Sequence, residues 1–146
     1  MTHREKAEAL FKEGYNCSQA VFGAFAGELG VDEKTALMLA AGLGGGVGRL
    51  REVCGAVTGM ALAISARRGY YEPGDTAAKG NLYAEIQQAA EQFRARNGAI
   101  VCKELLGEGK STPVPSPRNA EYFHKRPCVE MVGSAAEILE KMWNAE

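Results

Sequence analysis

The sequence predicts an all-α protein, and three observations support that fold class. Apolar side chains recur at spacings of three and four residues in most segments, as on one face of a helix. No stretch alternates polar and apolar residues over the length of a strand. Residues typical of helix N-caps precede several apolar runs, and glycines follow them. We therefore expect a single-domain helical bundle of about six to seven helices over residues 1–146.

Capping residues mark where several of the expected helices begin. Thr2 with Glu5, and Asn16 with Gln19, match the capping-box pattern of a polar cap followed three residues later by Glu or Gln. Asp75 is the expected N-cap of the longest helix. In chain order, the expected helices cover about residues 2–11, 17–26, 32–42, 51–68, 75–97, 99–106 and 127–143, with a glycine-rich loop at 44–48, a proline-rich loop at 107–118 and a charged, aromatic segment at 121–126.

Composition excludes several classes of function. The chain is 46% hydrophobic and 24% charged, as in an ordinary globular protein, and its formal net charge is -1. That balance offers no electrostatic basis for binding nucleic acid or a membrane surface. No apolar run approaches the roughly 18 residues of a membrane span, and no signal-peptide core follows the N-terminus. We expect a cytoplasmic protein, in which cysteines more often serve redox or metal chemistry than structural disulfides.

Four cysteines are the main functional candidates. None belongs to a Cys-x-x-Cys pair, so thioredoxin-like and zinc-ribbon motifs are absent. Each falls at or near the start of an expected helix, where unpaired N–H groups and partial positive charge lower a thiol's pKa and favour the thiolate. A thiolate is both a nucleophile and a metal ligand. If the helix ends converge, the candidate catalytic residues and metal ligands are Cys17, Cys54, Cys102 and Cys128.

A glycine run at residues 44–48 leads into Cys54. Its spacing does not match the dinucleotide-binding fingerprint, because Arg49 or Arg51 stands where the third glycine is required. We expect the run to bend the backbone tightly, and Gly55 to clear space beside the thiol. The two arginines are expected to lower the pKa of that thiol, to hold an anion, or to lie exposed as charges at the start of the helix. Gly55 and Arg49 are therefore the candidate cofactor-binding residues.

The residues alone leave three hypotheses open. In the first, two cysteines such as Cys17 and Cys54 cycle between dithiol and disulfide, which would make the protein an oxidoreductase. In the second, the four thiolates hold an iron–sulfur cluster or another metal. In the third, the protein is a helical interaction module whose cysteines only fill the core. The third predicts dispersed sulfurs, whereas the first two require that the cysteines meet.

The order of these motifs resembles the C_GCAxxG_C_C family, over nearly the whole chain. The segments that carry the resemblance are Tyr15-Asn16-Cys17-Ser18, Gly44-Gly45-Gly46-Val47-Gly48-Arg49, Glu52-Val53-Cys54-Gly55-Ala56-Val57-Thr58-Gly59, Cys102-Lys103-Glu104-Leu105-Leu106-Gly107 and Cys128. The family name places a glycine before its second cysteine, whereas here Val53 precedes Cys54 and the glycine follows it.

The resemblance implies a redox role for the four cysteines without naming a reaction or a redox partner. A related cysteine-containing domain occurs in split-Soret cytochromes, which carry haem and an iron–sulfur centre. This chain has no Cys-x-x-Cys-His motif for haem attachment, so only the iron–sulfur part carries over. The cofactor that the resemblance allows is thus an iron–sulfur cluster or another thiolate-bound metal. A homodimer is compatible with a helical protein of this size.

Overall fold

The fold is all-α, as predicted. The computed structural model describes residues 1–107, 112–119, 122 and 127–146. Within these residues the chain forms seven α-helices, one short 3-10 helix and no β-strand. The helices are α1 (His3–Lys12), α2 (Cys17–Phe25), α3 (Glu33–Ala40), the 3-10 helix η1 (Ala41–Leu43), α4 (Gly55–Arg68), α5 (Thr76–Asn97), α6 (Cys102–Leu106) and α8 (Cys128–Asn144).

Both predicted capping boxes are present. The side chain of Thr2 accepts a hydrogen bond from the N–H of Glu5, whose carboxylate accepts one from the N–H of Thr2. Asn16 and Gln19 exchange the same pair of bonds at the start of α2. Asp75 caps α5, as the sequence predicts. These local interactions satisfy N–H groups that a helix end leaves unpaired, so the starts of these helices follow from the sequence alone.

Two helices begin later than predicted, for one shared reason. The segment before α4 and the segment before α6 pair as an isolated antiparallel bridge between Val53 and Val101. Because these residues are extended, α4 begins at Gly55 instead of residues 51–52, and α6 begins at Cys102 instead of residue 99. Cys54 is therefore the N-cap of α4 and lies before its first turn.

The glycine-rich loop winds in a left-handed sense. Five consecutive residues, 45–49, have φ between 55° and 74°, and Arg51 has φ of 63°. Gly46 adopts this conformation without steric cost, but Val47 and Arg49 carry a Cβ, and left-handed backbone costs such residues roughly 1–2 kcal/mol each. Backbone bonds hold the turn, among them one from the N–H of Glu52 to the carbonyl of Gly46 at 2.9 Å.

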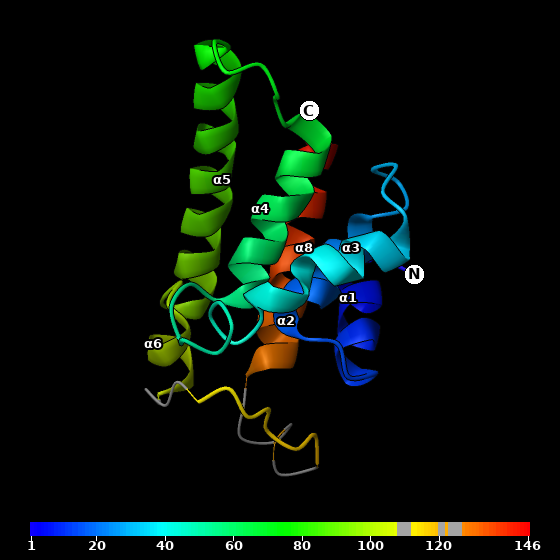
Figure 1. The fold of residues 1–146 in the computed structure, drawn as a ribbon, viewed down its shortest axis with the longest axis vertical. Coiled ribbons are helices and arrows are strands. Elements are labelled where there is room, and N and C mark those ends of the chain that lie inside the picture. Colours follow the sequence, from blue (N-terminus) through cyan, green and yellow to red (C-terminus); the bar gives the residue numbers. More distant parts are fainter. Residues whose placement is uncertain (108–111, 120–121, 123–126) are drawn as a thin grey trace.

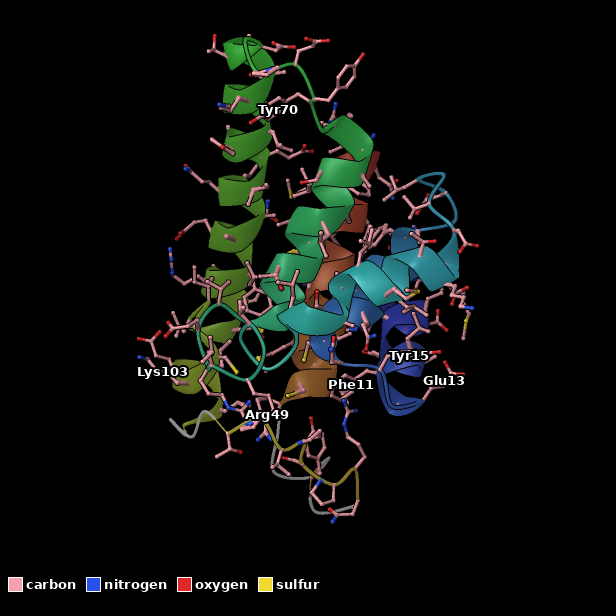
Figure 2. The ribbon with its side chains drawn as sticks, in the orientation of Figure 1. Phe11, Glu13, Tyr15, Arg49, Tyr70 and Lys103 are labelled. Carbon is pink, nitrogen blue, oxygen red and sulfur yellow. The ribbon has the colours of Figure 1, made fainter. Side chains whose placement is uncertain are left out.

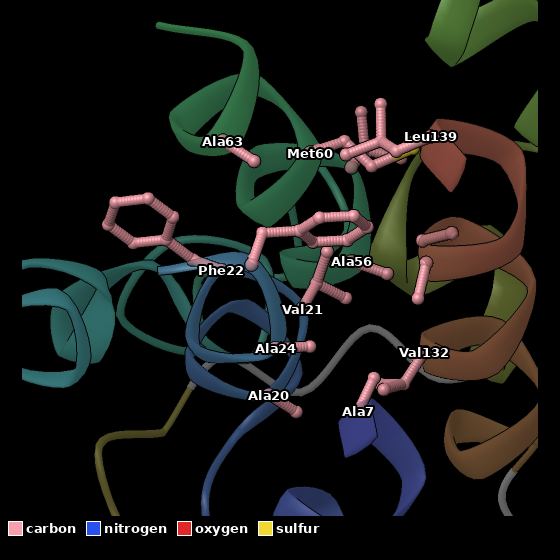
Figure 3. Close-up of a cluster of buried hydrophobic side chains, with 14 of the residues drawn as sticks. Ala7, Ala20, Val21, Phe22, Ala24, Ala56, Met60, Ala63, Val132 and Leu139 are labelled. Carbon is pink, nitrogen blue, oxygen red and sulfur yellow. The ribbon is translucent and has the colours of Figure 1, made fainter. Parts of the chain in front are cut away.

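The core lies between α1, α2, α4 and α8, and α5 packs along α4 and α8 (Figure 1). Alanines make up much of it, so the helices approach one another closely. Figure 3 shows larger side chains filling the spaces between those alanines. Residues labelled there are Ala7, Ala20, Val21, Phe22, Ala24, Ala56, Met60, Ala63, Val132 and Leu139, all of them buried.

The close approach of α2 and α4 depends on Gly59. A Cβ on this residue would lie 2.9 Å from the Cβ of Val21 and 3.0 Å from the carbonyl oxygen of Ser18. The first contact is shorter than real Cβ atoms make and the second is unusually tight, so any larger residue would push the helices apart. Since Cys17 begins α2 and Cys54 caps α4, this contact also sets how close the two cysteines come.

Some of the sequence expectations lie partly outside the described residues. The proline-rich loop is described at residues 112–118, where it contains no helix, while 108–111 are not described. Of the charged segment at 121–126, only Tyr122 is described. The last helix begins at Cys128, immediately after Pro127, close to the predicted start. No helix in the described part of the chain is both long and apolar enough to span a membrane.

Candidate functional site

The four cysteines converge on one cavity. Cys17, Cys102 and Cys128 are the first residues of α2, α6 and α8, and Cys54 is the N-cap of α4. All four line a cavity of about 60 Å³, which we call the thiol cavity. The glycine-rich loop, α6 and the first turn of α8 gather around it at the lower end of the molecule in Figure 1. The condition that the sequence left open, that four helix starts meet in space, is therefore met.

The bridge between Val53 and Val101 brings two of the cysteines together. The N–H of Cys54 donates to the carbonyl of Ile100 at 2.8 Å. The N–H of Cys102 donates to the carbonyl of Glu52 on the opposing segment. Cys54 follows Val53 and Cys102 follows Val101, so the two cysteines are diagonal neighbours on the two paired segments. Both line the thiol cavity.

Two glycines make room for the other elements at the cavity. A Cβ on Gly46 would lie 2.7 Å from the Cβ of Cys102, so only glycine lets the loop pass this close to α6. A Cβ on Gly55 would lie 3.0 Å from the Cβ of Cys17. The sequence analysis expected Gly55 to clear space beside Cys54. In the structure, Gly55 instead makes room for the side chain of Cys17.

Cys17 and Cys54 do not have the low pKa values that their helix-start positions predict. The pKa of Cys17 is raised well above its ordinary value, first by a hydrogen bond with the Cys128 thiol and then by burial. Burial raises the pKa of Cys54 to about 12, although the N–H groups of Ala56 and Val57 at the start of α4 act in the opposite direction. The helix N-terminus does favour the Cys54 thiolate, but desolvation and neighbouring thiols outweigh it.

A buried cation contacts one thiol. The side chain of Arg51 is only 2% exposed, and its Nη1 donates to the Sγ of Cys102 at 3.7 Å. Burying a guanidinium group is costly unless nearby groups compensate its charge. A guanidinium beside a sulfur favours the thiolate form. Arg51 therefore favours ionisation at Cys102, whereas the sequence assigned this effect to Cys54.

The part that Arg118 has in the site could not be predicted from the sequence. Its Nη1 donates to the carbonyl of Phe11 at 3.0 Å, and its Nη2 donates to the carbonyl of Tyr15 at 3.1 Å. Its guanidinium also lies over the rings of Phe11 and Tyr122, at 4.2 and 4.9 Å from their centres. These contacts hold the end of the proline-rich loop against α1. Arg118 and Tyr122 both line the thiol cavity.

A second, larger cleft adjoins the thiol cavity. Its volume is about 310 Å³, and its walls include Arg49, Arg51 and Arg118, so we call it the arginine cleft. Arg49 lies outside the lining of the thiol cavity, and its Nη2 contacts the Oγ of Ser116 at 3.5 Å. Arg51 and Arg118 line both spaces. Arg49 is thus placed to touch a molecule bound near the thiols, not the thiols themselves.

Neither a disulfide nor a ready-made metal site is present at the four cysteines. All four lie within the described residues, and none is joined to another by a disulfide. Across the described part of the chain, no group of three or more His, Cys, Asp or Glu side chains is arranged to hold a metal ion. The cysteines share one cavity in this arrangement without forming a coordination shell, and their role as metal ligands stays a prediction.

These features place the protein in a class of helical proteins with a buried multi-thiol site. A family model matches residues 15–142, nearly the whole chain, and its description is "Putative redox-active protein (C_GCAxxG_C_C)". The chain belongs to this C_GCAxxG_C_C family, as the resemblance indicated. The comparison with curated proteins and the comparison with solved structures gave no match.

Proposed function

We propose that the protein is a two-electron thiol redox protein in which Cys17 and Cys128 form the exchanging pair. The observation that carries this proposal is the single cavity that all four cysteines line, in which Cys128 is the neighbour with the largest effect on the pKa of Cys17. Both residues begin a helix, so oxidation would connect α2 to α8 at their N-terminal ends. The pairing expected from the sequence, Cys17 with Cys54, is replaced in this proposal by Cys17 with Cys128, because Cys128 has the largest effect on the pKa of Cys17.

The electron balance requires a disulfide as oxidant. Cys17 and Cys128 lose their protons and form one S–S bond, while the acceptor disulfide is cleaved and its two sulfurs leave as thiols carrying those protons. The reverse reaction reduces the protein. Cys102 is the entry thiol in this scheme, because the adjacent Arg51 guanidinium favours its thiolate. Its mixed disulfide with the acceptor is then displaced by the paired thiols, which line the same cavity.

The second candidate is a thiolate-bound metal or iron–sulfur cluster. Four cysteines around one cavity are the number of ligands that such clusters commonly use, which favours this alternative over dispersed core cysteines. Since the described side chains are not arranged as a metal site, binding would require the thiols to draw together. The thiol redox proposal needs only two of these thiols to meet, and Cys17 and Cys128 line the same small cavity.

Disulfide mapping separates these candidates. The protein is purified anaerobically, analysed for iron and sulfide, and then oxidised with a low-molecular-weight disulfide before alkylation and mass spectrometry. We expect metal-free protein and a Cys17–Cys128 peptide, absent from Cys17→Ser and retained in the matched variant Cys54→Ser. Stoichiometric iron with acid-labile sulfide would overturn the proposal in favour of a cluster. The absence of any disulfide in metal-free protein would overturn both.

A further inference from the structure

We propose that Arg118 closes the thiol cavity and that release of its guanidinium group admits a reacting molecule to the cysteines. We call the contacts of this residue with Phe11, Tyr15 and Tyr122 the Arg118 clasp. The inference goes beyond the proposed function, because it concerns access to the sulfurs and holds whether they exchange disulfides or bind a metal.

Three of the four thiols are enclosed. Cys54, Cys102 and Cys128 are only 3%, 6% and 5% exposed, whereas Cys17 is partly exposed. The thiol cavity, at about 60 Å³, is far smaller than the roughly 300–1,000 Å³ of sites that hold a whole small molecule. A molecule that reacts with the enclosed thiols therefore requires part of the cavity wall to move aside.

The parts of this wall are held in different ways. The cysteines belong to helix starts, and the glycine-rich loop is closed by backbone bonds such as that from the N–H of Glu52 to the carbonyl of Gly46. Arg118 and Tyr122 also line the cavity. Among the described residues, no backbone hydrogen bond joins residues 112–119 to a helix, so side-chain contacts hold this part of the wall in place.

Arg118 makes such contacts with both of its terminal nitrogens and with the face of its guanidinium group. Nη1 donates to the carbonyl of Phe11 at 3.0 Å, and Nη2 donates to the carbonyl of Tyr15 at 3.1 Å. Its Cζ lies 4.2 and 4.9 Å from the ring centres of Phe11 and Tyr122. Most of residues 112–119 are exposed, whereas Arg118 is half-buried. One planar, rigid group thus connects this segment to α1 and to the link that follows it.

The clasp is attached to the chain close to Cys17. The carbonyl of Phe11 belongs to the last turn of α1, where the partial negative charge of the helix end favours a cation. Tyr15 lies in the link between α1 and α2, two residues before Cys17. Figure 2 shows Phe11 and Tyr15 near the lower end of the molecule, where Arg49 of the glycine-rich loop also lies. Release of Arg118 would therefore remove part of the cavity wall and loosen the link that leads to Cys17.

The contacts of Arg118 suit a closure that can be reversed. Because Arg118 is half-buried, its guanidinium can return to water, and the carbonyls that it leaves can accept hydrogen bonds from water instead. Arg51, the other cation in the cavity wall, is 2% exposed and would need a much larger rearrangement to leave. Local openings require less free energy than global unfolding, so the folded protein can open at Arg118 while its core stays packed.

Alkylation of the reduced protein with iodoacetamide tests the clasp, because this small, uncharged reagent reports access to each thiol by mass spectrometry. We expect Cys54, Cys102 and Cys128 to react at least about tenfold faster in Arg118→Ala than in the wild type, since one charge-assisted hydrogen bond contributes about that factor to an equilibrium. Arg118→Lys keeps the charge but not the fork, so it should give a smaller acceleration. The matched control Arg94→Ala, on α5 and outside the cavity wall, should react like the wild type. Equal rates in the wild type and both Arg118 variants would overturn the inference.

Urea distinguishes a local opening from a weakened fold. A local opening exposes little surface, so its rate changes little with urea, whereas alkylation through global unfolding rises steeply with urea. We expect the acceleration in Arg118→Ala to be nearly independent of urea below the unfolding transition. An acceleration that follows the global unfolding equilibrium would make Arg118 a merely stabilising residue and would contradict the inference. If Arg118→Ala does not fold, Arg118→Lys decides the same comparison.

The clasp and the redox proposal fail separately. The double variant Cys17→Ser/Cys128→Ser removes the exchanging pair but keeps Cys54, Cys102 and the clasp, and adding Arg118→Ala should still speed alkylation of the two remaining thiols. If it does so while no disulfide ever forms in the protein, the redox proposal falls and the clasp stands. If the Cys17–Cys128 disulfide forms while the Arg118 variants change no rate, only the clasp is excluded.

Discussion

The apolar core differs from the thiol end of the molecule, by which we mean the thiol cavity and the glycine-rich loop at residues 44–51, in the kinds of side chain and backbone that it contains. In the core, Phe25, Met60 and Leu139 pack among alanines with almost no exposure. Around the thiol cavity the same chain buries Arg51, crowds four cysteines together and holds Val47 in left-handed backbone. The core is built mainly of apolar side chains packed among helices, whereas the thiol end breaks several rules at once. Such conflicts are expected where a protein is shaped for chemistry instead of stability.

The comparison also separates two kinds of effect. Substitutions in the core should change the free energy of unfolding through lost volume or lost contact. Those at the thiol end should change pH dependence, reactivity or strain, with smaller effects on stability. The predictions below test this division, beginning with the largest expected change.

Truncating a core aromatic should be the most damaging change. Phe93 on α5 is fully buried, and Phe93→Ala should lower the free energy of unfolding by about 3–5 kcal/mol, because the side chain leaves a cavity. Tyr71 is 88% exposed, so Tyr71→Ala should change stability by no more than about 0.5 kcal/mol. Urea denaturation measures both. A Phe93→Ala protein as stable as the wild type would show that this region is not a packed core.

Two glycine-to-alanine changes should have opposite signs. At Gly59 the added Cβ meets the backbone of α2, so Gly59→Ala should destabilise the protein by about 1–3 kcal/mol. Gly80 is an exposed position in α5, and a Cβ added there would meet no atom of another element within 4 Å. Gly80→Ala should therefore stabilise the helix by about 0.5–1 kcal/mol. Thermal unfolding of the two variants gives the signs directly. If both changes stabilised the protein, the close contact of α2 with α4 would be wrong.

The raised pKa of Cys54 should appear as a loss of stability in alkali. Burial moves this pKa from the ordinary 9.0 to about 12 in the folded protein. Because the folded value is the higher one, the corresponding stability is complete below about pH 9 and is lost as the pH rises toward 12. Between about pH 9 and about pH 10, the unfolding free energy of the wild type should fall by about 1 kcal/mol more than that of Cys54→Ala. Parallel pH curves for the two proteins would mean that Cys54 is not buried as a neutral thiol.

Relieving backbone strain should produce the smallest change. Val47 has φ of 66°, so Val47→Gly removes a cost of roughly 1–2 kcal/mol and adds a flexibility cost of roughly 0.5–1 kcal/mol. The net expectation is a gain of about 0.5 kcal/mol in the free energy of unfolding. Val114 is exposed and has no positive φ, so Val114→Gly serves as the control and should not stabilise. Destabilisation of both variants alike would contradict the left-handed turn.

The parts of the fold that local sequence decides were predictable, and those that depend on distant segments were not. Caps such as Thr2 and Asn16 set helix starts through contacts three residues away, so the sequence was sufficient there. The start of α4 was predicted too early, because pairing of Val53 with Val101 joins segments far apart in the chain. Long-range pairing of this kind leaves no periodic signal in either segment.

The candidate site divides in the same way. The four cysteines could be found from their positions before helices and from the family resemblance. The direction of the pKa shifts of Cys17 and Cys54 could not, because burial at Cys54 outweighs the helix N-terminus, and burial depends on the whole fold. Arg118 was missed, since a single arginine in a proline-rich loop does not reveal that it packs onto Phe11 and lines the thiol cavity.

The most direct test of the central claim is an equilibrium redox titration of the intact protein. Samples are poised with mixtures of a reduced and an oxidised dithiol, and the Cys17 and Cys128 peptides are quantified after alkylation. The account predicts one two-electron transition, with about 30 mV for each tenfold change in the ratio of oxidised to reduced protein. That transition should vanish in Cys128→Ser and persist in Cys54→Ser. Thiols that stay reduced at every potential, or a transition that survives Cys128→Ser, would contradict the account.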